Sequence, residues 1–237
     1  MVASKAAYNI VNVIPMSSPK VTLVRIEPTD LAITLREIYN SLANLCWINN
    51  LPNVSRVFRK SLQARATGTV EVLKNELVLN PDSSLSSSAG EYVVSELAHS
   101  TVVNELNYLD IPLGELIKQK VKGNPGFDFF SVNPTTMVLL FGEAKYKARA
   151  NAYDSAFAQI VRFVEQEEKD IKDMADLEHL CPAGAQDKVA DGIKGYMAAF
   201  SSTSMSDKVL KDHIEKHADF QKLLKYEELV CVAVNLS

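Results

Sequence analysis

The sequence is poor in cysteine. It has only Cys46, Cys181 and Cys231, which are far apart and form no CxxC pair. Three isolated cysteines argue against a disulfide framework, which needs an even number at regular spacing. The first twenty residues lack the apolar core of a signal peptide, and no apolar run approaches the roughly 18 residues of a membrane-spanning helix. We therefore expect a protein of the reducing cytoplasm with no membrane segment.

The sequence also lacks an excess of basic charge. Its 25 Lys and Arg residues face 29 Asp and Glu residues, for a formal net charge of −4. The overall charge gives no indication of nucleic acid, although a local basic strip could still bind one, because recognition depends on where charge is placed. No glycine-rich phosphate loop, G-x-S-x-G motif or Ser/His/Asp arrangement is present. The common motifs for nucleotide binding and for serine nucleophiles are therefore missing.

Apolar residues, in contrast, are plentiful and make up 47% of the sequence. The length of 237 residues suits one large domain or a core domain with an appended subdomain. In the N-terminal part we expect a strand at 20–28, a helix from Asp30 to about 51, and a partly helical segment at 54–79. The Ser- and Pro-rich stretch 80–90 is typical of a linker.

This linker predicts two parts. Residues 1–80 would form a mainly helical region and a docking surface for a partner, and residues 81–237 a second domain. In the second domain the patterns predict, in order, these elements: a helix at 90–109 that the last residues of the linker cap, with Ser86 to Ser88 leading into it, a hairpin at 127–146, one long helix at 150–180, helices near 186–200 and 206–225, and a last strand at 228–237. This order predicts an α/β (α+β) fold, in which helices flank a small mixed sheet.

The hairpin carries the residues that point to chemistry. Asp128 precedes its first strand, and Glu143-Ala144-Lys145 ends its second strand. Because strands joined by a short turn are antiparallel, the geometry brings Asp128 close to Glu143 and Lys145. Two carboxylates at an apolar strand end are costly unless a cation lies between them. Mg²⁺ or Mn²⁺ suits such oxygen ligands, with the Ala144 carbonyl as a further ligand, and Lys145 could polarise water or neutralise developing charge.

Asp, a hairpin, and then Glu-x-Lys resembles the signature of the PD-(D/E)xK nuclease superfamily, although Phe127 stands where that signature often has proline. The resemblance covers residues 88–165 and implies a restriction-endonuclease-like core, in which a helix, a three-stranded sheet, a helix and a strand follow one another. It also implies a metal-supporting Glu on the first helix, for which Glu91 matches better than Glu96. Gln159 would then face the site from the following helix.

The motif order Gly90-Glu91, Gly126-x-Asp128 and Gly142-Glu143-x-Lys145 resembles, more narrowly, the nuclease subunits of Hachiman-type anti-phage systems and related abortive-infection nucleases. This resemblance implies a metal-dependent deoxyribonuclease that works as a defence effector with a helicase-like ATPase partner. A second Glu-x-Lys, Glu167 to Lys169, lies in a charged helical stretch and has no facing Asp.

Several alternatives stay open. The trio of Asp128, Glu143 and Lys145 could be a surface ion-pair group, and the chain could be a non-catalytic subunit that binds a partner or DNA. Structural zinc could be bound by two pairs, His179 with Cys181 and His213 with His217. Nearby cations could contact phosphates or form solvated faces: Lys118, Lys120, Lys122, Lys147, Arg149 and Arg162.

Overall fold

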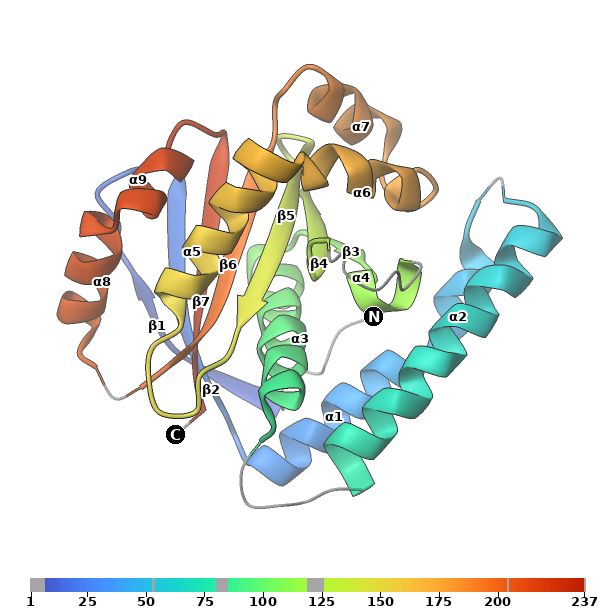
Figure 1. Ribbon diagram of the computed structural model, residues 1–237, viewed down its shortest axis with the longest axis horizontal. Helices are drawn as coiled ribbons and strands as arrows, with labels where there is room; N and C mark the ends of the chain where they lie inside the picture. The colour runs from blue at the N-terminus through green and yellow to red at the C-terminus, as the bar shows by residue number, and fades with distance from the viewer. Residues whose placement is uncertain (1–6, 53, 80–84, 119–125, 204, 237) are drawn as a thin grey trace.

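The computed structural model describes residues 7–52, 54–79, 85–118, 126–203 and 205–236 (Figure 1). Within these residues, seven strands form one mixed sheet in the order β1-β2-β7-β6-β5-β4-β3. The strands are β1 (Tyr8–Ile14), β2 (Val21–Pro28), β3 (Leu109–Ile111), β4 (Phe129–Asn133), β5 (Val138–Lys145), β6 (Gly195–Ser202) and β7 (Glu228–Asn235). Strands β2, β7, β6 and β5 run parallel, and β1, β4 and β3 add antiparallel pairs at the two edges.

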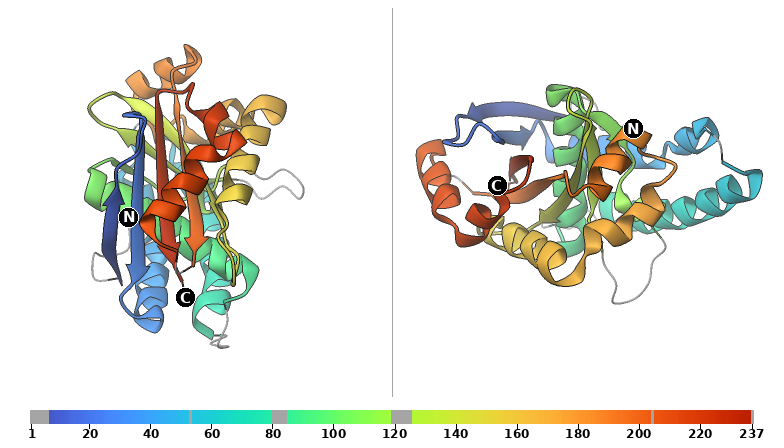
Figure 2. Two further views of the ribbon diagram at one scale, coloured as in Figure 1. Left: turned by 90° about the vertical axis from the view of Figure 1, so that its left-hand side faces the viewer. Right: turned by 90° about the horizontal axis from the view of Figure 1, so that it is seen from above.

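Helices cover both faces of this sheet. The described helices are α1 (Leu31–Ala43), α2 (Arg56–Lys74), α3 (Ser87–Leu106), α4 (Gly114–Ile117), α5 (Tyr153–Arg162), α6 (Lys169–Leu177), α7 (Ala183–Ala190), α8 (Asp207–Lys216) and α9 (Ala218–Leu223), with short 3₁₀ or π turns at Leu45–Asn50, Asn75–Leu79 and Phe163–Glu167. Helix α3 packs on β4 to β7 from one side, whereas α5 packs on β5 and β6 from the other (Figures 1 and 2). The protein is therefore a three-layer α/β structure, as its order of elements predicted.

The inner strands have no polar face. All eight residues of β6 and the six central residues of β7 are buried, because parallel strands between two helical layers lose water on both sides. The predicted helix at 186–200 is confirmed only as far as Ala190, and its second half was wrong for this reason. Helix α7 ends at Ala190, Gly192 takes a positive φ of 79°, and β6 begins at Gly195. A short, fully buried run such as that of β6 shows no alternation of apolar and polar residues that would separate it from a buried helix.

The predicted long helix at 150–180 is also wrong, because it is three pieces. Helix α5 passes into a π turn, and Glu168 with a φ of 49° redirects the chain into α6. The redirection buries Asp170, which accepts a hydrogen bond of 2.8 Å from the Tyr196 hydroxyl and pairs with Lys194. The helix predicted at 206–225 is likewise two helices, α8 and α9, separated by His217 in an extended conformation.

The N-terminal region is helical only in part. Helices α1 and α2 lie outside α3, and the predicted strand at 20–28 is confirmed as β2. That strand and β1 belong to the main sheet, since β2 pairs with β7, so the description of residues 1–80 as mainly helical was too simple. The division near residue 80 falls on residues outside the described ranges and stays a prediction. No helix in the described ranges is long and apolar enough to cross a bilayer.

Candidate active site

The hairpin predicted around Asn133 is formed by β4 and β5. Its strands pair from Phe129 opposite Gly142 to Asn133 opposite Val138. The turn is held locally, because the Asn133 side-chain oxygen accepts hydrogen bonds from the main-chain N–H groups of Thr135 and Thr136 at 3.0 and 3.3 Å. This turn fixes the register, and the register places the start of β4 beside the end of β5.

Asp128 lies directly before β4 and is anchored to the end of β5. Its main-chain N–H donates to the Gly142 carbonyl at 2.8 Å, and its Oδ2 accepts from the Ala144 N–H at 2.8 Å. Gly142 leaves room for the ring of Phe129, with which a Cβ at that position would clash. These two contacts with the backbone of β5 hold the Asp128 carboxylate beside the strand that carries Glu143 and Lys145.

Glu143 and Lys145 form the centre of the site. Glu143 is 1% exposed, and its Oε1 lies 2.7 Å from the Lys145 ammonium nitrogen. Beyond this ion pair, neither carboxylate oxygen of Glu143 has a hydrogen bond with acceptable geometry among the described residues. The Lys145 nitrogen also lies 3.0 Å from the Ala144 carbonyl oxygen and 3.4 Å from Oε1 of Glu91 at the start of α3. Oxygen atoms from three residues therefore converge on one cation.

Burial perturbs both carboxyl groups, and the charge of Asp128 adds to the effect on Glu143. Burial raises the pKa of Asp128 to about 6, although Lys145 and the Ala144 N–H oppose the change. Burial and then the charge of Asp128 raise the pKa of Glu143 well above its usual range. Burial lowers the pKa of Lys145, but the charges of Glu143 and Asp128 more than offset it, so its net change is upward. Lys145 is therefore a positively charged ammonium group at neutral pH. Its single charge is not enough to neutralise the carboxylates of both Asp128 and Glu143.

A small acidic cavity opens beside Asp128. It has a volume of about 100 Å³ and is lined by Ser88, Glu91, Tyr92, Ser95, Glu115 and Asp128. Burial raises the pKa of the Tyr92 hydroxyl, and the charges of nearby acids, Glu115 first, add to that rise. Glu115, on α4, was not among the candidate residues. The sequence offered only one indication of a role for Glu115, its position in the short stretch before Asp128. The sequence did not predict whether that stretch is a helix or a strand.

The donor set fits a hard divalent cation. No group of three or more His, Cys, Asp and Glu side chains is arranged to hold a metal among the residues that the structure describes. Mg²⁺, however, is usually held by only one or two carboxylates and completes its shell with water and phosphate oxygens. Asp128 and the hydrogen-bond-free oxygens of Glu143 meet that requirement. The Lys145 ammonium shows that this position accepts positive charge.

The other candidates are placed as follows. Glu91 contacts the trio through Lys145, whereas Glu96 is buried deeper in α3 and accepts from the Ser41 hydroxyl at 3.0 Å. Gln159 is half-buried on α5, across the sheet from α3, and no hydrogen bond in the described ranges joins its side chain to the trio (Figure 1).

The flanking cations divide into three groups. Lys118 pairs with Asp173 at 2.7 Å, and Arg162 pairs with Glu167 at 3.1 Å, so these two have acidic partners. Lys147 and Arg149 are exposed just beyond Lys145. Two further predicted phosphate contacts, Lys120 and Lys122, lie outside the described residues.

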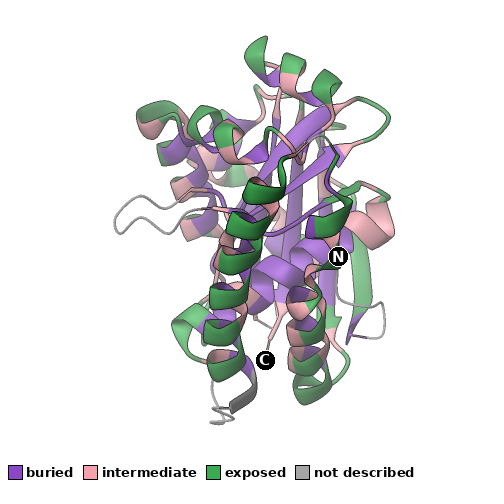
Figure 3. Cartoon of the chain, turned by 90° about the vertical axis from the view of Figure 1, so that its right-hand side faces the viewer, coloured by how far each residue is buried: buried purple, intermediate pink, exposed green. Residues whose placement is uncertain are grey.

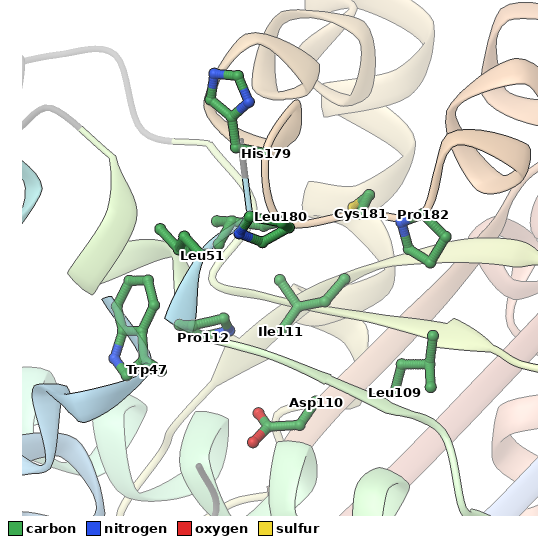
Figure 4. A pocket seen from close by; sticks show the side chains of 11 residues that line it. Trp47, Leu51, Leu109, Asp110, Ile111, Pro112, His179, Leu180, Cys181 and Pro182 are labelled. Carbon is green, nitrogen blue, oxygen red and sulfur yellow. The ribbon is translucent and has the colours of Figure 1, made fainter. Parts of the chain in front are cut away.

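A larger, apolar cavity lies at the β3 edge of the sheet. It measures about 450 Å³ and is lined by Trp47, Leu51, Pro52, Leu109, Asp110, Ile111, Pro112, His179, Leu180, Cys181 and Pro182 (Figure 4). None of the trio lines it, so it is separate from the acidic site.

The residues of the alternative zinc site have unrelated surroundings. His179 stacks edge-on against Phe58 beside the apolar cavity. His213 lies 3.4 Å from the Tyr153 hydroxyl, and His217 pairs with Asp154. The two pairs therefore contact different elements, and the described chain offers no support for a zinc site that joins them.

A scan against models of protein families found no match, and a search of curated proteins found no relative.

Proposed function

We propose that this protein is a metal-dependent deoxyribonuclease that hydrolyses phosphodiester bonds at the site of Asp128, Glu143 and Lys145. One observation carries the proposal: Glu143 is buried, and its carboxylate oxygens make no hydrogen bond in the described chain beyond the ion pair with Lys145. A purely structural ion pair would satisfy these oxygens, whereas a ligand site leaves them open for a bound group.

The order of elements around the hairpin supports the same proposal. A helix (α3), three strands (β3, β4 and β5), a helix (α5) and a parallel strand (β6) occur in this order along the chain, with α4 inserted between β3 and β4, and α6 and α7 inserted between α5 and β6. This is the order that the resemblance to PD-(D/E)xK nucleases implies for a restriction-endonuclease-like core. The trio lies where that core would hold its catalytic residues, at the end of the second hairpin strand.

Each residue has a distinct proposed role. Asp128 and Glu143 would hold Mg²⁺ or Mn²⁺, with Glu91 as a supporting acid at the entrance. When bound, the ion would act as a Lewis acid on a phosphate oxygen and lower the pKa of bound water. Lys145, held as an ammonium group by its neighbours, would donate hydrogen bonds to a non-bridging phosphate oxygen or orient the attacking water. Gln159 is kept as a supporting residue, without a contact that explains its role.

The biological setting is proposed from the motif order alone. By resemblance to Hachiman-type nuclease subunits, the protein would be an anti-phage effector whose activity a helicase-like ATPase partner regulates. A subunit that only binds DNA or a partner is the alternative, and the presence of all three site residues weighs against it.

The experiment compares cleavage of plasmid and linear DNA in Mg²⁺, in Mn²⁺ and in EDTA, by the protein alone and with any co-purified ATPase. The double variant Glu143→Ala with Lys145→Ala should lose cleavage while its melting temperature stays near that of the wild type. Cleavage that survives this change would show that the site is assigned wrongly. A variant that fails to fold would instead indicate a structural ion pair.

A further inference from the structure

We propose that Lys118 and Asp173 are positioning residues, which hold Asp128 where it can bind a metal ion. The inference rests on the proposed nuclease function and names the groups that keep one of its metal ligands in place. Strands β4 and β5 are buried along almost their whole length, inside more exposed helices (Figure 3). Asp128 lies one residue before β4, where the pairing of these strands begins only after it, so other contacts must hold it.

The peptide groups on both sides of the Asp128 Cα are held. In the peptide before it, the Phe127 carbonyl accepts a hydrogen bond of 2.5 Å from the Lys118 ammonium group, and the Asp128 N–H donates to the Gly142 carbonyl at 2.8 Å. In the peptide after it, the Asp128 carbonyl accepts from the Gly114 N–H at 2.7 Å. Because each peptide group is planar, these three contacts restrict the backbone that carries the carboxylate. Of the three, only the contact from Lys118 is made by a side chain.

Asp173, on α6, completes this arrangement. Its Oδ2 lies 2.7 Å from the Lys118 ammonium nitrogen and accepts the Phe127 N–H at 2.8 Å. Lys118 and Asp173, which we call the clamp, therefore bind both main-chain polar groups of Phe127. The Phe127 ring packs in the core against Phe141 and Phe163, with ring centroids 5.4 and 5.3 Å apart. The residue before Asp128 is thus fixed through its N–H, its carbonyl and its side chain.

The clamp also accounts for Gly126, a motif position that the proposed roles do not use. The φ of Gly126 is not in the left-handed region, so its backbone conformation does not require glycine. A Cβ at this position would instead clash with the ammonium nitrogen of Lys118 and the carboxylate of Asp173. The lack of a side chain at 126 therefore leaves room for the clamp beside the main chain.

A second buried ion pair on the same helix provides a matched control. Asp170 pairs with Lys194 and accepts from the Tyr196 hydroxyl at 2.8 Å. Asp170 and Asp173 are both buried, 1% and 6% exposed, so each needs its partners to offset the cost of a buried charge. The partners of Asp170 lie at the start of β6 and make none of the contacts that hold Asp128. The two carboxylates therefore differ in whether they are connected to the proposed metal ligand.

The test compares three variants with the wild type. Asp173→Asn removes the negative charge of the clamp, Gly126→Ala pushes the two clamp side chains away from the main chain, and Asp170→Asn is the control. Urea denaturation in EDTA measures the stability of each protein without bound metal. Electron paramagnetic resonance of free Mn²⁺ gives the affinity of the folded protein for that ion. Cleavage of plasmid DNA is then measured against Mn²⁺ concentration.

If the inference holds, Asp173→Asn and Gly126→Ala weaken Mn²⁺ binding by about 10–100-fold, which is the loss typical of residues that orient a metal ligand. The Mn²⁺ concentration that gives half-maximal cleavage should rise by a similar factor. Asp170→Asn should bind Mn²⁺ within about twofold of the wild type, because distant sites act independently, even if it loses as much stability as Asp173→Asn.

The outcomes separate this inference from the proposed function. Equal losses of Mn²⁺ affinity in Asp173→Asn and Asp170→Asn, or wild-type affinity in Gly126→Ala, would overturn the inference and leave the nuclease function standing. A wild-type protein that binds no Mn²⁺ and cleaves no DNA would overturn both. If Asp173→Asn does not fold, the affinity of Gly126→Ala decides the question alone.

Discussion

Changing Asp128 to Asn should stabilise the metal-free protein while it removes activity. The pKa of Asp128 rises from 3.8 to about 6 on folding because the carboxyl is buried. A folded-state pKa above the unfolded one means that the folded protein holds the proton more tightly, so stability is highest below about pH 4 and falls as pH rises through about 6. At about 1.4 kcal/mol for each pKa unit, the ionised carboxylate costs the folded state up to about 3 kcal/mol at pH 8. Asn keeps the shape and can still accept the Ala144 N–H, but it carries no charge.

The assay is urea denaturation in EDTA at pH 5 and at pH 8. The variant should be more stable than wild type by up to about 3 kcal/mol at pH 8, and by roughly half of that at pH 5, where the wild-type carboxyl is mostly protonated. In a protein of this size such a difference raises the melting temperature by several degrees. An Asp128→Asn variant that is no more stable at pH 8, or a difference that does not change with pH, would refute the reasoning.

Magnesium should cancel most of this stability difference at pH 8. An ion that binds only the folded state stabilises it by about 2.7 kcal/mol at a concentration of about 100 Kd. Mg²⁺ should therefore raise the melting temperature of the wild type and leave the Asp128→Asn variant nearly unchanged. Equal stabilisation of both proteins would show that the ion binds elsewhere.

Further predictions concern groups outside the trio. Burial raises the pKa of Glu228 from 4.5 to about 7, so the stability of the wild type should decline between these two pH values. The Glu228→Gln variant should flatten that decline in melting curves taken from about pH 5 to 8. An unchanged pH profile would contradict the raised pKa of Glu228. A Cβ at Gly90 would clash with the Tyr146 ring, so Gly90→Ala should cost about 1–3 kcal/mol in urea denaturation. Gly68→Ala is the matched control, because a Cβ there meets nothing within 4 Å, and this change should raise the free energy of unfolding by about 0.5–1 kcal/mol. If both changes destabilise the protein, the cause is a general effect of the methyl group and not the clash with Tyr146.

Local signals in the sequence predicted the parts of the structure that depend on near neighbours. Asp30 and Ser86 cap α1 and α3 as their positions suggested, each accepting from the N–H three residues later. The hairpin was predictable because the turn at Asn133 and the two apolar runs beside it specify its pairing locally. Antiparallel pairing alone predicted that Asp128 would lie beside the end of β5, where its carboxylate accepts a hydrogen bond from the Ala144 N–H.

The errors arose where distant partners decide the local structure. Strand β6 is buried throughout because β5 and β7 flank it and helical layers cover it, and nothing in its own residues indicates those neighbours. The break at Glu168 serves Asp170, whose partners Tyr196 and Lys194 come much later in the chain. Glu115 joins the acidic cavity only because α4 folds back onto Asp128, whose carbonyl accepts the Gly114 N–H at 2.7 Å.

The position of β7 has a consequence for synthesis. This strand lies between β2 and β6, so it joins the first-made part of the sheet to the part that bears the acidic residues. A nascent chain on the ribosome cannot close the sheet until Asn235 has emerged, however early Glu143 was translated. Premature stop codons before that point would leave two sheet fragments whose edge strands have unpaired backbone groups.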